Sequence, residues 1–276
     1  MESEVVAERF GSYLLAHPNL HVAHRHSFYH IVLFTKGGGT HSIDFKQFPV
    51  APGQIYFMKP GQVHSWSFEG ATDGYVINFS EHLFDNFLAN GRYIDQFLFF
   101  QGLAEEGVIN LQPDVRTEAE AIAEKIIAEA LNHSAHTPDL LKVYFLELFM
   151  GVDRSIAKHS PGADKPHNQL LLHNFRKLVD THYAEKRLPK EYAAMLYITP
   201  NHLNALCKDL LGTSAGEIIR NRILLEAKRL LINADISISE IAATLNFTDN
   251  SHFTRFFKKH TTLTPEEFRR SSFNKN

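Results

Sequence analysis

The sequence has 276 residues, of which 44% are hydrophobic and 12% aromatic, and its formal net charge is -3. This composition excludes wholesale disorder, and the length favours two domains of roughly 100–200 residues each. The single cysteine, Cys207, excludes a disulfide framework and fits a reducing compartment. The first residues are acidic and no run of about 18 apolar residues occurs. We therefore expect a soluble, cytoplasmic protein with no membrane partner.

The small net charge conceals an asymmetry between the two parts of the chain. Residues 1–164 carry 11 Lys and Arg against 20 Asp and Glu, whereas residues 165–276 carry 17 against 11. The net charges are therefore -9 and +6. A basic module joined to an acidic one indicates a partner that is itself an acidic polymer, such as DNA.

Residues 10 to 111 are typical of a β domain. Short apolar runs rich in Phe, Tyr, Ile and Val are separated by turn formers, namely Gly37-Gly38-Gly39, Pro52-Gly53, Pro60-Gly61 and Asp73-Gly74. Turn signals at this spacing predict a sandwich or a small barrel.

Helical periodicity replaces the β pattern at Pro113. Apolar residues recur at helical spacing from Ile122 to Leu131, and a second helix is predicted to begin at Pro138. The apolar stripe of that second helix is broad and extends from Leu140 to Val152. Two interpretations stay open, because a broad apolar face indicates burial without naming the partner. The stripe either packs on the barrel or, in part, forms a homodimer.

A turn-rich linker without an apolar anchor is predicted at residues 159–167, where the charge changes sign. Beyond it the chain is predicted to be helical throughout. Two of these helices have a threonine cap followed by proline, at Thr199-Pro200 and Thr264-Pro265. The predicted helices are 168–185, 189–196, 200–211, 214–233, 238–245, 249–261 and 265–271.

The basic part contains one helix–turn–helix pattern twice. Residues 193–199 align with residues 242–248, and the helices that follow align with one extra residue in the second copy. A short helix, a tight turn and a second helix with an apolar seam form the motif whose second helix enters the DNA major groove. A single unit would be equally typical of an ordinary helical hairpin. Two units in the basic part favour DNA binding.

The tail resembles the C-terminal DNA-binding domain of the AraC family of bacterial transcription regulators. The resemblance covers residues 168–271 and is carried by Ile241-Ala242, Leu245, Phe247, Asp249, Ser251, Phe253, Arg255, Phe257-Lys258-Lys259, Thr264-Pro265 and Phe268-Arg269. It implies base-facing residues in both units, which are Asn201 and Asn204, and Asn250, Ser251, Thr254 and Arg255. Lys208, Lys258 and Lys259 complete the predicted DNA-binding set, because lysine holds phosphates.

Three positions depart from the family pattern. Asn246 and Thr262 stand where glycine is usual. Asparagine tolerates a positive φ better than other non-glycine residues, so we expect the turn at Asn246 to survive. Ala205 is the counterpart of Arg255 and cannot bond guanine bidentately, so the first unit is expected to read fewer bases. The helix at 214–233 would hold the two recognition helices about one DNA turn apart, roughly 34–36 Å.

The front half resembles the cupin-type barrel with which this family senses ligands. Two sets of alternating residues are each expected to share one strand face, namely His24, His26, Phe28 and His30, and His64, Trp66 and Phe68. The predicted ligand-binding residues are His24, His26, His30, His64 and Trp66. In metal-bearing cupins the positions of His24, His26 and His64 bind the metal, and an acid stands near the position of His30.

We predict an α+β, multidomain fold. It has an N-terminal cupin-like β-barrel or jelly roll followed by helices, and a C-terminal all-α domain with two helix-turn-helix units. The predicted boundaries are 1–112 for the barrel, 113–158 for a helical dimerisation segment, 159–167 for the linker and 168–276 for the DNA-binding domain. Within the last, the two units occupy 189–211 and 238–261, on either side of the linker helix.

The predicted function is that of a sequence-specific DNA-binding transcription regulator controlled by a small-molecule effector. A sugar is one candidate effector, the chain is expected to act as a homodimer, and RNA polymerase is a further candidate partner. No cofactor or bound metal is expected. The alternative is a divalent metal held by His24, His26, His30 and His64, in a metal sensor or a metal-dependent cupin enzyme. Because the acidic member of that motif is missing and the DNA-binding tail is present, we expect no enzyme activity. A regulator whose barrel binds no ligand is the third alternative.

Overall fold

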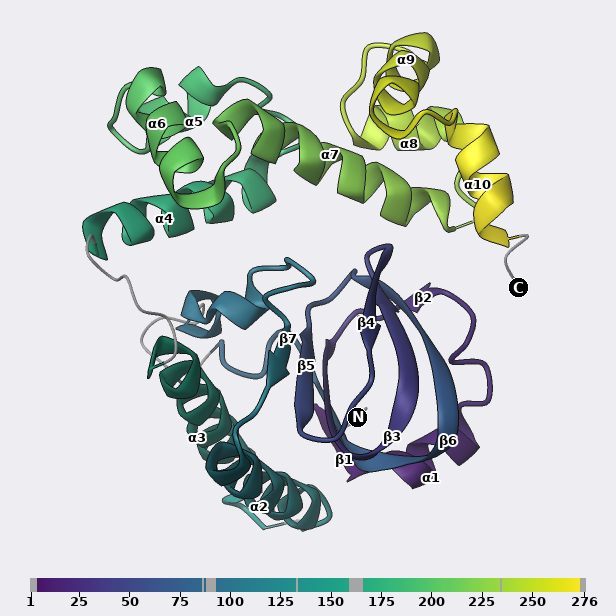
Figure 1. Cartoon of the computed structure of the whole chain (residues 1–276), viewed down its shortest axis with the longest axis vertical. Helices are drawn as coiled ribbons and strands as arrows, with labels where there is room; N and C mark the ends of the chain where they lie inside the picture. Colours follow the sequence, from purple (N-terminus) through teal and green to yellow (C-terminus); the bar gives the residue numbers. More distant parts are fainter. Residues whose placement is uncertain are drawn as a thin grey trace. The chain divides into compact units, whose positions relative to one another are not determined.

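The computed structural model describes residues 4–85, 87, 93–132, 134–158, 166–233 and 235–273. Contacts divide the chain into two compact units, residues 1–161 and 162–276, and each is described by itself (Figure 1). Most of the predicted linker, residues 159–165, lies outside the described residues. Within the described part, no helix has the length and apolar character needed to cross a membrane.

The first unit is built on one antiparallel sheet that curls into a barrel (Figure 1). Its spatial order is β1-β6-β3-β5-β7, while β2 pairs with β6 and β4 pairs with β3. The strands are β1 (Val5–Arg9), β2 (His24–Arg25), β3 (Tyr29–Ile43), β4 (Lys46–Pro49), β5 (Gln54–Met58), β6 (Val63–Phe79) and β7 (Val108–Asn110). The predicted barrel-type fold is confirmed.

Two irregularities bend β3 as it runs along β6. The register shifts between Phe34 and Lys36 and again between Lys36 and Gly38. At Gly39 the backbone has a φ of +115°, and a Cβ would lie 2.1 Å from the carbonyl oxygen of Ser67, so only glycine fits this crossing. Because bulges insert unpaired residues, even-numbered residues before the shifts and odd-numbered residues after them point to the same side.

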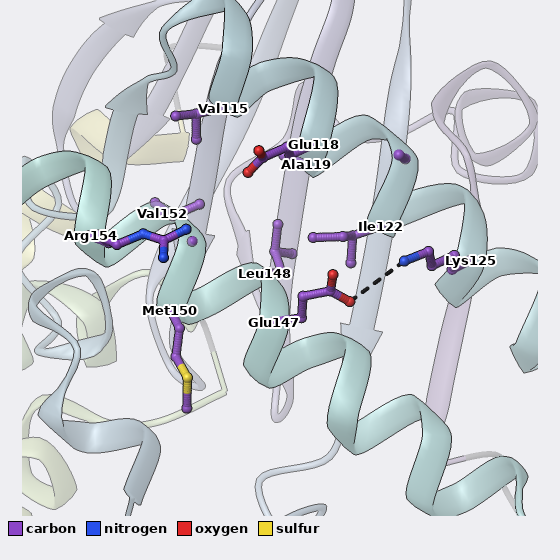
Figure 2. Close-up of a pocket in the computed structure, with 12 residues that line it drawn as sticks. Val115, Glu118, Ala119, Ile122, Lys125, Glu147, Leu148, Met150, Val152 and Arg154 are labelled. Carbon is purple, nitrogen blue, oxygen red and sulfur yellow. Dashed lines mark ion pairs between the residues drawn. The ribbon is translucent and has the colours of Figure 1, made fainter.

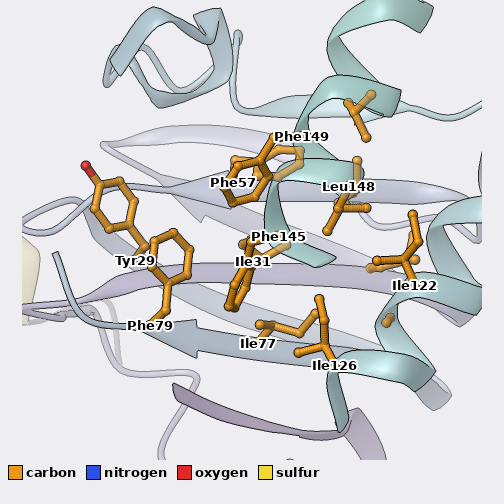
Figure 3. Packing of buried hydrophobic residues seen from close by; sticks show 14 of the residues in the cluster. Tyr29, Ile31, Phe57, Ile77, Phe79, Ile122, Ile126, Phe145, Leu148 and Phe149 are labelled. Atoms are coloured by element: carbon orange, nitrogen blue, oxygen red, sulfur yellow. The ribbon is translucent and has the colours of Figure 1, made fainter. Parts of the chain in front are cut away.

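The barrel unit has two hydrophobic cores, one on each face of the sheet. The inner core contains Val32, Phe34, Ile43 and Trp66 together with Phe10 and Tyr13 of helix α1 (Phe10–Ala16). The outer core lies between the sheet and the helices α2 (Pro113–Ala130) and α3 (Thr137–Lys158). It includes aromatic side chains from the sheet and from α3 (Figure 3).

The prediction of continuous β structure from residue 10 is wrong in two places. Residues 10–16 form α1, because Phe10 and Tyr13, three residues apart, both enter the inner core. The 3-10 helices η1 (Tyr93–Gln96) and η2 (Leu98–Phe100) replace an expected strand. In η2, Phe99 packs on Phe57 and Phe100 packs on Phe149, which favours a compact turn over an extended chain.

Helix α3 uses most of its broad apolar stripe against the sheet. Leu141, Phe145, Leu148, Phe149 and Val152 are buried in the outer core. The first of the two interpretations, packing on the barrel, is therefore confirmed for these residues. Leu140, Val143 and Met150 stay exposed, so the same helix also presents apolar side chains to the outside.

The second unit is entirely helical in its described part. Its helices are α4 (Pro166–His182), α5 (Pro189–Met195), α6 (Pro200–Leu211), α7 (Ala215–Leu231), α8 (Ile238–Thr244), α9 (Asn250–Thr261) and α10 (Pro265–Phe273). The seven predicted helices agree with these bounds to within a few residues. One core forms around α4 to α7 and another around α7 to α10.

The ends of α6 and α9 close in the same way with different residues. Gly212 and Thr262 both adopt the left-handed conformation, with φ of 69° and 68°, and each backbone N–H donates to the carbonyl four residues earlier. This conformation is strained for a β-branched residue such as threonine.

Thr262→Gly is expected to stabilise the helical unit by about 0.5–1 kcal/mol, because relief of strain exceeds the added entropy of the unfolded chain. Gly212→Ala, where a Cβ meets nothing within 4 Å, is the matched control and should destabilise by about 1 kcal/mol. Urea denaturation of both variants measures the two changes. Destabilisation by Thr262→Gly would contradict the assignment of strain.

Candidate functional site

The two helix-turn-helix units, α5–α6 and α8–α9, repeat one backbone geometry. Tyr197 and Asn246 occupy the turns with φ of 56° and 53°. The residue after each of them donates its N–H to a carbonyl five positions back, at 3.0 Å from Ile198 and 2.9 Å from Phe247. This is the Schellman closure of a helix, so the expectation that Asn246 preserves the turn is confirmed.

Side-chain caps fix where each recognition helix begins. The hydroxyl of Thr199 accepts the N–H of His202 at 3.1 Å, and the carboxylate of Asp249 accepts the N–H of His252 at 2.7 Å. Such caps satisfy N–H groups that have no partner within the helix. Both helices therefore start at a defined residue, with their first turns open to solvent.

Helices α6 and α9 each have a buried seam and a polar outer face. In α9 the rings of Phe253 and Phe257 are fully buried, while Phe256 is half-buried. In α6 the seam is Leu203, Leu206 and Cys207. Burial raises the pKa of the Cys207 thiol to about 11, which fits a core role rather than a reactive one.

Most of the predicted DNA-binding residues lie on these outer faces. The exposed ones are Asn201, Lys208, Asn250, Ser251, Arg255, Lys258 and Lys259, whereas Asn204 and Thr254 are half-buried. Ala205, the counterpart of Arg255 in the first helix-turn-helix unit, is also exposed. The outer face of α9 is thus the more basic of the two.

Three polar residues on or near these faces also make internal contacts. The Asn204 side-chain oxygen accepts the N–H of Ala215 at 3.1 Å and so caps the start of α7. Asn250 donates its amide to Ser239 at 2.7 Å, which ties α9 to α8. Arg269, one of the residues that carry the family resemblance, donates to the carbonyl of Ile236 at 2.5 Å.

Arg187 connects the two helix-turn-helix units, although no pattern in the sequence singled it out. Its guanidinium donates to the carbonyls of Leu245 and Asn246, at 2.5 and 3.0 Å, and lies 4.0 Å from the centroid of the Phe247 ring. Phe247 and Phe256 in turn pack on the core that surrounds the first helix-turn-helix unit, α5–α6. These contacts hold the turn of the second helix-turn-helix unit, α8–α9, against the first.

A half-buried charge network between α4 and α7 supports this connection. Arg222 donates to Asp180 at 2.7 Å and to Glu226 at 2.9 Å, and its guanidinium lies 4.0 Å from the centroid of the Tyr183 ring. The two carboxylates raise the pKa of Arg222 against the opposing effect of burial. Residues of α7 belong to both cores of the helical unit, and Tyr183 packs against both, so α7 joins them as a shared wall.

In the barrel unit, imidazoles from three strands or strand ends converge. His24 on β2 is the cross-strand neighbour of His64 on β6, and one ring nitrogen from each of His24, His26 and His64 lies within 4.8 Å of the others. The His30 ring centroid lies 5.2 Å from that of His26 and 5.3 Å from that of His64. The expected single strand carrying His24 to His30 is wrong, because β2 ends at Arg25 and β3 starts at Tyr29.

Burial keeps His26, His30 and His64 neutral at physiological pH. Desolvation, with a smaller effect from neighbouring histidines, lowers the pKa of His26 to about 4 and that of His30 to about 3. The same cause lowers the pKa of His64 well below its usual value. A neutral imidazole offers a lone pair, so the cluster can act as a set of nitrogen donors.

The cluster has a fifth member that the sequence analysis missed, His41. His41 is fully buried, and its Nε2 lies 3.2 Å from the Nδ1 of His64. Its ring stacks on the Trp66 ring at a centroid distance of 3.2 Å. Burial lowers its pKa well below the usual value. Trp66 is itself 2% exposed and is enclosed by Phe34, Tyr56 and other aromatic rings.

A barrel with an internal polar cluster, joined to a helical unit with two capped and interlocked helix-turn-helix elements, defines a class. It is that of DNA-binding transcription regulators with a separate ligand-binding domain.

Comparison with known proteins identifies the family within this class. The model of the AraC-like ligand binding domain matches residues 13–149, and that of a helix-turn-helix domain matches residues 192–271. The chain belongs to the AraC family of transcription regulators, and the families and relatives it matches are regulators rather than enzymes.

The similar proteins divide by how much of the chain they cover. The transcriptional activator RhaS of Klebsiella pneumoniae is 22% identical over 89% of this chain and 86% of its own length. The uncharacterised regulator YijO of Escherichia coli is 32% identical, but over 37% of this chain and 36% of its own length. Among solved structures, ToxT of Vibrio cholerae is 13% identical over 98% of both chains, with a TM-score of 0.47.

Proposed function

We propose that this DNA-binding regulator is controlled by a small ligand held in its barrel, and that it reads DNA with the outer faces of α6 and α9. The observation that supports the proposal most strongly is the interlock between the two helix-turn-helix units. It makes them one rigid reader with polar side chains on both recognition helices. Since bacterial promoters lie in the cytoplasm, we place the protein there.

For base reading we assign Asn201, Ser251, Thr254 and Arg255, with Asn204 and Asn250 combining a DNA contact with their internal hydrogen bonds. Arginine bonds guanine bidentately and asparagine bonds adenine, whereas hydroxyls and lysines hold either base edges or phosphates. Lys208, Lys258 and Lys259 supply attraction to phosphates. The more basic α9 would carry most of the specificity, because α6 has Ala205 at the position that corresponds to Arg255.

Arg255→Ala is expected to cost about 1–3 kcal/mol at the preferred DNA site and to relax the preference at one base position. Its guanidinium is exposed and donates an intrahelical hydrogen bond to the carbonyl of Ser251 at 3.3 Å. Lys259→Ala is the matched contrast and should lower the salt dependence by about one phosphate contact without changing base preference. Anisotropy titrations on singly randomised sites measure both. An unchanged base preference would remove Arg255 from the reading set.

Ligand control requires that the occupied barrel favours one arrangement of the DNA-binding units over another, since a ligand shifts an equilibrium only by its differential affinity. The imidazole cluster supports a ligand site in the barrel because it places several neutral nitrogen donors together. A sugar is one candidate effector, and RNA polymerase is a candidate partner for an activator.

We further propose that the chain forms a homodimer through the outer side of α2 and α3. A half-open groove of about 530 Å³ runs there, lined by Ile122, Lys125, Glu147, Met150 and neighbouring residues (Figure 2). Lys125 and Glu147 form an ion pair across it at 3.7 Å. Val143 and Met150 are exposed two turns apart on one side of α3, and an equivalent helix from a second copy would cover them.

The variant Val143→Lys/Met150→Lys is expected to raise the dissociation constant of this dimer by at least about 100-fold, because an apolar interface would have to bury unpaired cations. Both side chains are exposed, so the fold itself should persist. Leu15→Lys, on the exposed side of α1, is the control and should leave association unchanged. Sedimentation velocity reports the result. A variant that sediments like the wild type would place the interface elsewhere.

The proposed function as a whole is tested by selecting bound DNA from a random pool, with and without metabolite mixtures. We expect one sequence with two spaced sub-sites, and an enrichment that changes when the effector is present. Selection of no sequence would refute specific reading, and a selection that no mixture alters would favour a ligand-independent regulator.

A further inference from the structure

The strongest unexplained feature of the barrel is a set of buried imidazole nitrogens without partners. The Nε2 atoms of His26 and His64 are buried and have no hydrogen-bond partner among the residues that the structure describes. His64 is only 2% exposed, so that atom lies away from the surface. Buried polar atoms are nearly always bonded, and an exception indicates an absent occupant or a functional role.

Three of the histidines are arranged to share one occupant. The donor nitrogens of His24, His26 and His64 lie within 4.8 Å of one another, and the ring centroids are 4.4 to 5.0 Å apart. Two nitrogens that bind one zinc ion at about 2.0–2.1 Å are roughly 3.3 Å apart. Small rotations about the side-chain bonds of the two half-buried residues, His24 and His26, would close this difference.

Hydrogen bonds at the other ring nitrogens leave the correct atoms available. The Nδ1 of His24 lies 2.8 Å from the carbonyl oxygen of Val22. Because a carbonyl only accepts, this Nδ1 carries the proton and Nε2 keeps its lone pair. His64 can likewise donate from Nδ1 to the Nε2 of His41 at 3.2 Å, which frees its own Nε2. Histidines that bind metal characteristically donate their second N–H in this way.

We propose that His24, His26 and His64 bind one divalent ion of a late first-row transition metal, of the zinc, nickel or copper class, with His41 as a positioning residue behind His64. The donor set is all imidazole, which suits these ions, whereas magnesium and calcium require oxygen ligands. His30 stands beside the site as a fourth imidazole. The inference rests on the proposed function, since it names the chemistry of the ligand that the barrel holds.

The test uses the tag-free full chain, stripped with a chelator and titrated with Zn²⁺ and Co²⁺. We expect one equivalent per chain by equilibrium dialysis and visible ligand-field absorption with Co²⁺. Co²⁺ should also quench the fluorescence of Trp66, which is the single tryptophan and whose ring lies 6.3 Å from that of His64.

The variants separate ligation from folding. His24→Ala/His26→Ala removes two half-buried ligands and should weaken binding by more than 100-fold with an unchanged unfolding curve. His41→Phe keeps the stack on Trp66 but removes the Nε2 partner, and should weaken binding by about 10–100-fold. His82→Ala, a remote exposed histidine paired with Asp85, should have no effect.

Failure to bind an equivalent of either ion, or equal affinity in the folded His24→Ala/His26→Ala variant, would overturn the proposal and favour an organic occupant. DNA affinity measured with and without Zn²⁺ keeps the two proposals distinct. Loaded protein that binds DNA as the metal-free protein does would establish the metal site and refute control through it. Wild type that binds no specific DNA would refute the proposed function alone.

Discussion

Metal-free protein transferred from pH 7 to pH 5 is expected to lose its barrel while the helical unit stays folded. The buried histidines have folded-state pKa values below the ordinary value of 6.5, at about 3 for His30 and well below 6.5 for His41 and His64. Below pH 6.5 the unfolded state therefore binds more protons than the folded state. Stability is complete above pH 6.5 and falls as the pH falls towards 3.

The expected effect is large for a single domain. His30 alone should cost about 2 kcal/mol by pH 5, at about 1.36 kcal/mol for each pH unit below 6.5. His41 and His64 act in the same direction. Their sum is a substantial part of the 5–15 kcal/mol that holds a typical domain folded.

Trp66 makes the barrel visible separately. It is the single tryptophan of the chain and lies in the inner core, so its fluorescence reports the barrel. Circular dichroism at 222 nm reports the helices of both units, most of whose described residues lie in the helical unit. We expect the fluorescence transition to coincide with a first, partial loss of dichroism, and most of the dichroism to persist to lower pH. His41→Phe should make the stability of the barrel less dependent on pH, and exposed His82→Ala should not. A barrel equally stable at pH 7 and pH 5 would contradict neutral, buried imidazoles.

How far the sequence predicts this structure depends on whether local signals or distant partners determine a residue. Thr199 and Asp249 start their helices as expected, because a cap and its N–H partner are three residues apart. The repeat of two helix-turn-helix units follows from such local signals. Arg187 could not be found in this way, since its partners Leu245 and Asn246 are nearly 60 residues further along the chain.

The imidazole cluster combines both situations. His24, His26 and His64 were predicted to come together, and they do, although the strand expected to carry the first two is broken. His41 was missed because simple alternation places it opposite to His30 on the same strand. The register shifts near Lys36 reverse that alternation, and nothing in the residue pattern measures how many shifts a run of glycines produces.

Arg187→Met is expected to reduce the affinity for a DNA site with two sub-sites by about 10–100-fold, which corresponds to about 1.4–2.8 kcal/mol. The variant loses charge-assisted hydrogen bonds to two carbonyls and the contact with the Phe247 ring. The carbonyls at the end of α8 then require water, and the second unit can change its angle to the first. Binding both grooves must then restore an orientation that the wild type already has.

Spacing distinguishes this loss of orientation from a lost DNA contact. Insertion of about five base pairs between the sub-sites, half a helical turn, should impair the wild type severely and Arg187→Met much less, because only a rigid reader demands one phase. Lys186→Met removes the same charge from the adjacent position and should keep the wild-type spacing requirement. Equal sensitivity to spacing in Arg187→Met and the wild type would show that Phe247 and Phe256 alone align the units. Hydrophobic contacts would then hold the two helix-turn-helix units together, and the guanidinium of Arg187 would be dispensable for reading DNA.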